Sequence, residues 1–216
     1  MLFDSVKNRP SFIAMGVILI LHFVGIFGLH SIYSDSFASL TPLNLLVTFL
    51  LILPFKGNTS LRLIVFFMFT FALGMLVEII GVQTGIPFGS YYYTSRMSLA
   101  VFGVPLMIGI NWFLLTYGLI SGVNYLAKDV SFIWKVLVCS ALMTFMDLLI
   151  EPFAIKYQLW VWESAHVPIQ NYIAWFVVSS IIFSLGFKII PKERNRVAAF
   201  TIIVFFLFFG VNYLTK

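Results

Sequence analysis

The 216-residue sequence is poor in charge and almost free of cysteine. Only 10% of its residues are Asp, Glu, Lys or Arg, whereas soluble domains carry about 25%. This shortage excludes a soluble globular domain, and an aromatic content of 18% excludes a disordered chain. The single cysteine, Cys139, can neither close an internal disulfide nor supply the ligands of a zinc or iron–sulfur site. No long basic run or stripe is present, so the sequence predicts no nucleic-acid partner.

Apolar residues take the place of the missing charge, since they make up 61% of the sequence and mean hydropathy is +1.04. A helix needs about 20 mostly apolar residues to cross a membrane. We therefore predict an all-α fold, in which residues 1–216 form a single integral membrane domain, a polytopic helical bundle. The seven expected transmembrane helices are Phe12–Leu29, Phe37–Phe55, Leu61–Gly81, Leu99–Ile120, Phe132–Ile150, Asn171–Ile190 and Val197–Leu214. Pro42 and Asn44 interrupt the start of the second one.

Lys and Arg are unevenly distributed over the loops that join these segments. With seven crossings, one side of the membrane holds ten of the 13 basic residues. These ten are Lys7, Arg9, Lys56, Arg62, Lys128, Lys135, Lys188, Lys192, Arg194 and Arg196, and the other side holds Arg96, Lys156 and Lys216. Because basic excess marks the cytoplasmic side, we predict that the N-terminus is inside and the C-terminus outside. The expected location is the cytoplasmic membrane of a bacterium.

The eight acidic residues divide into two groups. Asp4, Asp35, Asp129 and Glu193 fall in tails or loops, where we expect them to be solvated. Glu78 instead lies about 25 Å along the third expected span, at 1.5 Å per residue. Asp147 and Glu151 lie at the end of the fifth span, four residues apart and so on one helix face. The third and fifth spans run in the same direction, so all three carboxyls are predicted to approach the outer membrane face.

A carboxyl group within a membrane helix is costly and is a functional-site hypothesis by default. The alternative is that these acids reach interfacial water or pair with Arg96 and Lys156. Glu151 also precedes Pro152 and could simply mark a helix end. A fourth acid, Glu163, falls in a loop, where solvation is the ordinary outcome.

Two long connections, residues 82–98 and 151–170, flank these acids and carry aromatic side chains. Glycines and a proline in the first one predict a tight, non-helical path. Non-helical backbone at membrane depth must be buried in protein or line a cavity. The candidate substrate-binding residues are Phe88, Tyr91, Tyr93, Asn111, Trp112, Trp160, Trp162, Asn171 and Trp175. Two alternatives stay open: an interfacial aromatic belt for the rings, and helix packing for the two asparagines.

Several cofactor motifs are missing. The seventh expected span contains no lysine, which excludes a retinal Schiff base of the microbial-rhodopsin kind. The three histidines, His22, His30 and His166, form no cluster of the kind found in di-iron membrane desaturases. No glycine-rich phosphate-binding loop is present either. The chemistry that remains is acid–base catalysis by carboxyl groups in an aromatic-lined pocket, and we expect no metal and no cofactor.

Motifs spread over about residues 70–180 resemble a known family. They are Glu78-x-x-Gly81-Val82-x-Thr84-Gly85-x-Pro87-Phe88-Gly89-x-Tyr91-x-Tyr93, Phe102-Gly103-Val104-Pro105-Leu106, Trp112-Phe113, Asp147-x-x-x-Glu151-Pro152, Trp160-x-Trp162 and Val167-Pro168-x-x-Asn171-Tyr172-x-x-Trp175. They resemble the carotenoid biosynthesis membrane proteins of the carotenoid 1,2-hydratase type, which include γ-carotene 1′,2′-hydratases and bisanhydrobacterioruberin hydratases. The outer spans match only in hydrophobicity.

The resemblance implies an enzyme that adds water across the terminal C1=C2 double bond of an acyclic carotenoid ψ-end, without a cofactor. Glu78, Asp147 and Glu151 would then be catalytic. One carboxyl would protonate the alkene to a tertiary cation, and an ionised partner would hold and deprotonate the water. Donor and base stay unassigned among the three. The carotenoid would enter from the lipid bilayer, and aromatic faces would stabilise the cation.

Three rival readings stay open. A carotenoid end-group cyclase begins with the same protonation but closes a ring instead of adding water. A small-molecule or proton transporter would use the acids as a relay, and it would need polar residues through the full depth of the bundle. The inner halves of the expected spans look nearly bare, which counts against it. The third reading is a structural subunit that binds carotenoid or partner helices through its many Phe residues.

Overall fold

The computed structural model describes residues 2–56, 60–127, 129–164 and 166–215, and it confirms the predicted all-α membrane bundle. Within these residues, six helices are long and apolar enough to cross a membrane. They are α1 (Leu2–Leu29), α4 (Ser60–Thr84), α5 (Leu106–Leu126), α6 (Phe132–Lys156), α7 (Ile169–Ile189) and α8 (Arg196–Leu214). Helices suit this setting because they satisfy every backbone hydrogen bond internally.

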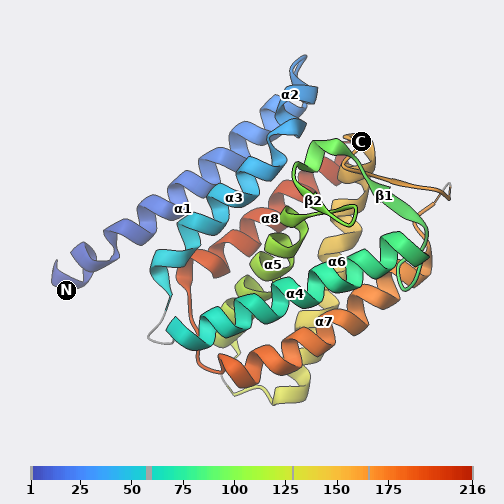
Figure 1. Cartoon of the computed structure of the whole chain (residues 1–216). Coiled ribbons are helices and arrows are strands. Elements are labelled where there is room, and N and C mark those ends of the chain that lie inside the picture. Colours follow the sequence, from blue (N-terminus) through green and yellow to red (C-terminus); the bar gives the residue numbers. More distant parts are fainter. Residues whose placement is uncertain (1, 57–59, 128, 165, 216) are drawn as a thin grey trace.

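The segment expected as the second span is divided. It contains the short helix α2 (Ser34–Ser39), the apolar helix α3 (Thr41–Ile52) and the 3-10 turn η1 (Leu53–Phe55). Pro42 lies in the first turn of α3, where a proline is tolerated because its missing N–H has no helical partner. Figure 1 shows α3 alongside α1, with the N- and C-termini at opposite ends of the bundle. The count of seven crossings stays a prediction.

Two expected helix boundaries were wrong. The fourth span does not begin at Leu99, because residues 100–105 form a small hairpin of β2 (Ala100–Val101) and β3 (Val104–Pro105). Its turn places Phe102 and Gly103 at φ values of 50° and 85°, which a helix cannot contain. The fifth span does not stop before Pro152. Helix α6 continues through this proline to Lys156, so Glu151 is not a helix end.

The two long connections meet at one end of the bundle. Strand β1 (Tyr91–Tyr93) pairs antiparallel with β4 (Trp160–Trp162), so that Tyr91 lies opposite Trp162 and Tyr93 opposite Trp160. The 3-10 turn η2 (Ser95–Met97) follows β1. This small sheet covers the end of the bundle where α4 and α6 stop and α7 begins (Figure 1).

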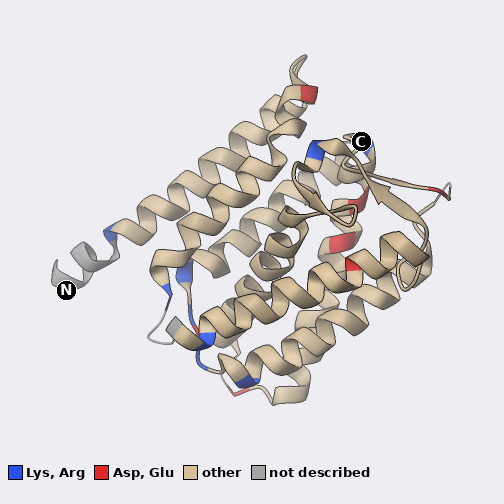
Figure 2. Cartoon of the chain, viewed as in Figure 1, with Lys and Arg blue, Asp and Glu red and all other residues tan. Residues whose placement is uncertain are grey.

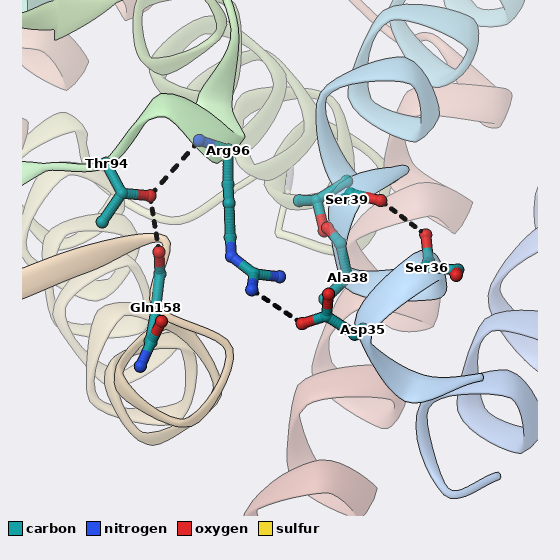
Figure 3. A network of polar contacts seen from close by, with 8 residues as sticks. Asp35, Ser36, Ala38, Ser39, Thr94, Arg96 and Gln158 are labelled. Carbon is teal, nitrogen blue, oxygen red and sulfur yellow. Dashed lines mark hydrogen bonds and ion pairs between the residues drawn. The ribbon is translucent and has the colours of Figure 1, made fainter. Parts of the chain in front are cut away.

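Polar contacts tie this sheet to its surroundings (Figure 3). The Thr94 hydroxyl donates to the Gln158 carbonyl at 2.6 Å and accepts from the Arg96 amide at 3.3 Å. The Arg96 guanidinium forms an ion pair with Asp35 of α2 at 2.7 Å. Arg96 therefore neutralises Asp35, and the sheet is held both to the end of α6 and to α2.

Helix α5 is the centre of the bundle. In its most apolar window 72% of the residues are buried, the largest share among the six long helices. It packs against α4 on one side and α8 on the other. Figure 2 shows most Lys and Arg at the end of the bundle that holds the N-terminus, and most acids towards the other end. Lys128 and Lys216, which entered the charge count, lie outside the described residues, as does the side chain of Lys7. The absolute orientation stays a prediction.

Candidate active site

Three acidic side chains are buried near the sheet-covered end of the bundle. Glu78, six residues before the end of α4, is 3% exposed. Asp147 and Glu151 lie one turn apart on α6 and are 1% and 3% exposed. The helices α4 and α6 both run towards the sheet (Figure 1), so the sequence prediction that these carboxyls approach the same end is confirmed. Burial of this kind requires hydrogen-bond donors, and each carboxyl has them.

Glu78 accepts three hydrogen bonds. Its Oε2 atom accepts from the Tyr93 hydroxyl at 2.8 Å and from the Tyr91 hydroxyl. Its Oε1 atom accepts from the indole N–H of Trp112 at 3.1 Å. Trp112 is fully buried and stacks on Trp175 at a centroid distance of 4.3 Å and an angle of 13°. Both carboxyl oxygens are thus held by rings that are themselves fixed.

The two carboxyls of α6 are held more loosely. Glu151 Oε2 accepts from the indole N–H groups of Trp160 and Trp162, at 3.1 and 2.9 Å. Asp147 Oδ2 accepts from the side-chain amide of Asn171 at 2.7 Å. Within the described part of the chain, neither Glu151 Oε1 nor Asp147 Oδ1 has a hydrogen-bond partner. Each of these carboxyls therefore has one oxygen available for another molecule.

The sheet supplies the donors through its alternation. Tyr91 and Tyr93 point to the same side of β1, as residues two apart do, and reach Glu78. Tyr92 between them points away and is 51% exposed. Burial, and then the adjacent Glu78 charge, raise the pKa of both inward phenols. The raised pKa keeps the phenols protonated, so they remain donors at physiological pH.

A single cavity of about 30 Å³ joins these groups. Its lining includes all twelve residues that the sequence proposed for the site, namely Glu78, Phe88, Tyr91, Tyr93, Asn111, Trp112, Asp147, Glu151, Trp160, Trp162, Asn171 and Trp175. Ile108 and Ile150 complete the wall and were not predicted. A water molecule needs about 10–15 Å³, so the cavity has room for one or two. In the described part of the chain, no group of three or more His, Cys, Asp or Glu side chains has the arrangement of a metal site.

The alternatives to a catalytic role, namely contact with interfacial water or pairing with Arg96 and Lys156, fit the structure less well. Arg96 pairs with Asp35, and the ammonium group of Lys156 lies over the Tyr157 ring, 5.5 Å from its centroid. Among the described residues, no salt bridge reaches Glu78, Asp147 or Glu151. Asn171 does more than pack between helices, because its amide bonds Asp147. Glu163, by contrast, is exposed, as expected of a loop residue.

The expectation that Glu193 is solvated was wrong. It is 3% exposed and accepts a hydrogen bond from the Tyr117 hydroxyl at 2.8 Å. Asn195 also donates to Tyr117, and Asn124 donates to the Glu193 carbonyl. This cluster lies at the other end of the bundle from the candidate site, so the inner half of the bundle is not bare. A loop position predicts solvation, but this loop folds back onto Tyr117 and Asn124 of α5.

The strand pairing was missed by the sequence analysis. The long connections predict loops, whereas the structure forms the strands β1 and β4 there. The signal was present in the alternation Tyr91-x-Tyr93 and Trp160-x-Trp162, because aromatic residues spaced two apart are typical of a strand with one buried face.

The fold and the site together define the class of protein: a polytopic helical membrane protein with a buried carboxyl cluster that is surrounded by aromatic side chains. The chain belongs to the carotenoid biosynthesis protein family, whose sequence model matches residues 40–215. This stretch contains every residue of the cavity wall. The bisanhydrobacterioruberin hydratase of Haloarcula japonica is 30% identical over 120 residues, which are 51% of this chain and 41% of that relative's length. No solved structure matches the chain.

Proposed function

We propose that the chain is a cofactor-independent carotenoid hydratase that adds water across the terminal C1=C2 double bond of an acyclic ψ-end. Family membership and the resemblance to a hydratase support a carotenoid substrate. The observation that carries the reaction type is the cavity itself. Three buried carboxyls from α4 and α6 share one small space with six tyrosine and tryptophan rings that donate to them or stack behind them.

Hydration of an isolated trisubstituted alkene starts with a proton on C2 and leaves a tertiary cation on C1. A buried carboxylic acid can give that proton, and a second carboxylate can take one from the attacking water. The cation needs stabilisation until water arrives. Desolvated aromatic faces contribute about 1–2 kcal/mol each, and the rings of Trp112, Trp162 and Tyr91 line the cavity. No redox change occurs, so the reaction needs no cofactor.

The architecture suits a substrate that is soluble only in lipid. A carotenoid is about as long as the bilayer is thick and can approach a membrane bundle laterally, while water comes from the outer face. An apolar cavity of about 150 Å³ holds benzene, so the cavity of about 30 Å³ is too small for a carotenoid end group. Entry of the end group therefore requires side chains of the wall to move. In the predicted orientation, the site lies near the outer face of a bacterial cytoplasmic membrane.

Two rivals make different demands on the structure. A cyclase must keep water away from the cation, whereas this cavity is the size of one or two waters. A transporter needs polar groups through the whole depth. On α5, Trp112 at the site and Tyr117 at the inner cluster are separated by the buried apolar residues 113–115, while the Thr116 hydroxyl bonds its own helix. The described residues thus form no continuous polar chain along α5.

The test is expression in a host that makes lycopene or γ-carotene, followed by mass and retention analysis of the carotenoids. The wild-type chain should yield product heavier by one water molecule. Glu78→Gln, Asp147→Asn and Glu151→Gln should each reduce that product about 100-fold or more, because each carboxyl would either transfer a proton or stabilise the developing cation. Glu163→Gln is the matched control, since Glu163 is exposed on the loop beside the site, and it should leave the yield unchanged.

Three outcomes would contradict the proposal. A product of unchanged mass and altered retention would identify a cyclase. No new product in a host with ample acyclic carotenoid would argue for a binding or transport role. Full hydration by the Asp147→Asn variant, expressed at the wild-type level, would remove Asp147 from the mechanism.

A further inference from the structure

A second cavity lies directly outside the candidate active site. Its volume is about 230 Å³, and it is lined by Ile155, Gln158, Trp160, Val161, Trp162, Ser164, His166 and Val167. Gln158, Ser164 and His166 are polar and exposed on the connection between α6 and α7. We call this cavity the vestibule. Three of its eight lining residues are polar, and all three are exposed, so water can enter the vestibule from this connection.

Trp160 and Trp162 belong to both cavities. They are the only described residues that line both, so Trp160 and Trp162 of β4 separate the vestibule from the carboxyl cavity. Both indole N–H groups donate to Glu151 Oε2. Glu151 is therefore the carboxyl attached to this wall, whereas Asp147 lies one helical turn before it on α6 and Glu78 is on α4.

The hydrogen bonds divide the three carboxyls further. Glu78 has donors on both oxygens, and any proton transfer through it would disturb Tyr91, Tyr93 or Trp112. Glu151 has both donors on Oε2, which leaves Oε1 to accept from a water molecule. Asp147 has a single amide donor on Oδ2, which leaves Oδ1 to carry a proton.

We infer that water reaches the active site from the vestibule past Trp160 and Trp162, and that Glu151 is the base that holds and deprotonates it, with Asp147 as the proton donor. The inference rests on the proposed hydratase function and assigns the roles that the sequence left open. Trp160 and Trp162 are positioning residues, because they orient Glu151 through its Oε2 atom and border the path of the water. Glu78 remains a fixed acceptor beside the developing cation.

The step balances without any further reactant. Asp147 gives its proton to C2, and the π electrons of the C1=C2 bond form the new C–H bond, which leaves the cation at C1. The oxygen of water forms a bond to C1 and loses a proton to Glu151. That proton returns to Asp147 across one helical turn, through water in the cavity. The net change is alkene plus water to tertiary alcohol.

Deuterium exchange separates the two halves of this step. Membranes that contain the full-length chain are incubated with lycopene in D2O buffer, and the recovered substrate and product are analysed by mass spectrometry. When water cannot add, the cation returns to alkene by losing a proton, and the substrate gains deuterium. Membranes without the chain give the background.

Glu151→Gln should lower the rate of hydration about 100-fold or more. Its rate of deuterium exchange into the substrate should stay within a few-fold of the highest exchange rate among the wild-type chain and the variants. Asp147→Asn should lose both hydration and exchange. The double variant Trp160→Phe, Trp162→Phe keeps two rings in the wall but removes both donors, and it should lower hydration about tenfold or more with exchange retained. Trp134→Phe is its control, because Trp134 is an exposed tryptophan of α6 that lines neither cavity.

The outcomes separate this inference from the proposed function. If Glu151→Gln hydrates normally, or loses exchange together with hydration, the assignment of Glu151 to water is wrong although wild-type hydration stands. Exchange that persists in Asp147→Asn would equally overturn the assignment of the donor. If the wild-type chain shows neither hydration nor exchange above background, the proposed function fails, and this inference fails with it.

Discussion

Glu78 accepts hydrogen bonds from two parts of the chain: Tyr91 and Tyr93 come from β1, and Trp112 comes from α5. A carboxyl group buried without hydrogen-bond partners is strongly destabilising, so these three donors are what allows Glu78 inside an apolar bundle. Hydrogen bonds to charged groups contribute about 1.5–3 kcal/mol each, and loss of one leaves the carboxylate partly unsatisfied.

Tyr91→Phe and Tyr93→Phe test this arrangement. Each change removes one hydroxyl donor and keeps the ring, so each should lower the proposed hydratase activity about tenfold to 100-fold. The matched control is Tyr92→Phe, because Tyr92 lies between them on β1 but points outwards. Product yield at equal expression is the measurement. A wild-type product yield from all three variants would show that the hydrogen bonds from Tyr91 and Tyr93 to Glu78 have no role in the reaction.

Single residues differ in how far the sequence reveals them. Glu78, Asp147 and Glu151 could be selected because a charge in an apolar segment is conspicuous, and all three line the cavity. Their donors could be named only as a group of nearby aromatic residues. Which donor reaches which carboxyl depends on the pairing of β1 with β4, and pairing across about 70 residues has no local signal. Glu193 was misjudged for the same reason, because its burial depends on how its loop packs on α5.

At the scale of elements, the approach of α4 to α5 fixes the back of the site. A Cβ atom at Gly74 of α4 would lie 2.8 Å from Cδ1 and Cγ of Trp112. Trp112 is fully buried, stacks on Trp175 and holds Glu78 through its indole N–H. The ring therefore has nowhere to move without disturbing the carboxyl cluster. Glycine at this position lets the tryptophan lie against the helix backbone.

Gly74→Ala should consequently destabilise the protein by about 1–3 kcal/mol, as overpacked cores do, and reduce product formation. Gly16→Ala is the control in another long helix, because a Cβ there would meet nothing within 4 Å. It should be neutral or slightly stabilising, since alanine favours a helix by up to about 1 kcal/mol over glycine. Thermal unfolding in detergent measures both. A Gly74→Ala variant as stable and active as wild type would mean that Trp112 can shift freely.

The elements that the sequence predicted best are the long apolar helices, where composition and length decide. Their ends were predicted less well. Pro152 is inside α6 although a proline usually ends a helix, and the apolar run that begins at Leu99 leads into a hairpin at residues 100–105 instead of a helix. In both places the departure from the expected helix end helps to build the site. Helix α6 must continue past Asp147 to present Glu151, and the hairpin brings the chain to Pro105, the N-cap of α5.

At the scale of the whole molecule, the remaining question is which end of the bundle faces outwards and whether α3 crosses the membrane. With 12 residues, α3 extends about 18 Å at 1.5 Å per residue, which is short of the roughly 30 Å hydrocarbon core. Yet α3 carries the chain from the sheet-covered end to the basic end, as the alternation of Lys and Arg requires (Figures 1 and 2). We therefore predict that α3 acts as a short crossing helix.

Cysteine labelling tests the topology directly, because the native Cys139 is fully buried and should stay unlabelled. Ser36→Cys and Lys56→Cys flank α3, and Ser164→Cys and Lys192→Cys flank α7. In intact cells, a membrane-impermeant maleimide should label positions 36 and 164, whereas positions 56 and 192 should react only after permeabilisation.

Each deviation from this labelling pattern has a distinct structural meaning. If all four accessibilities are reversed, the bundle is inverted and the carboxyl cavity faces the cytoplasm, where water would still reach Glu151 through the vestibule. If positions 36 and 56 label from the same side while 164 and 192 stay on opposite sides, α3 does not cross and the chain has six spans. In that case the N-terminus and the C-terminus share a side of the membrane. Two of the basic residues, Lys7 and Arg9, would then lie on the side with fewer Lys and Arg, so the charge bias that supports seven crossings would weaken.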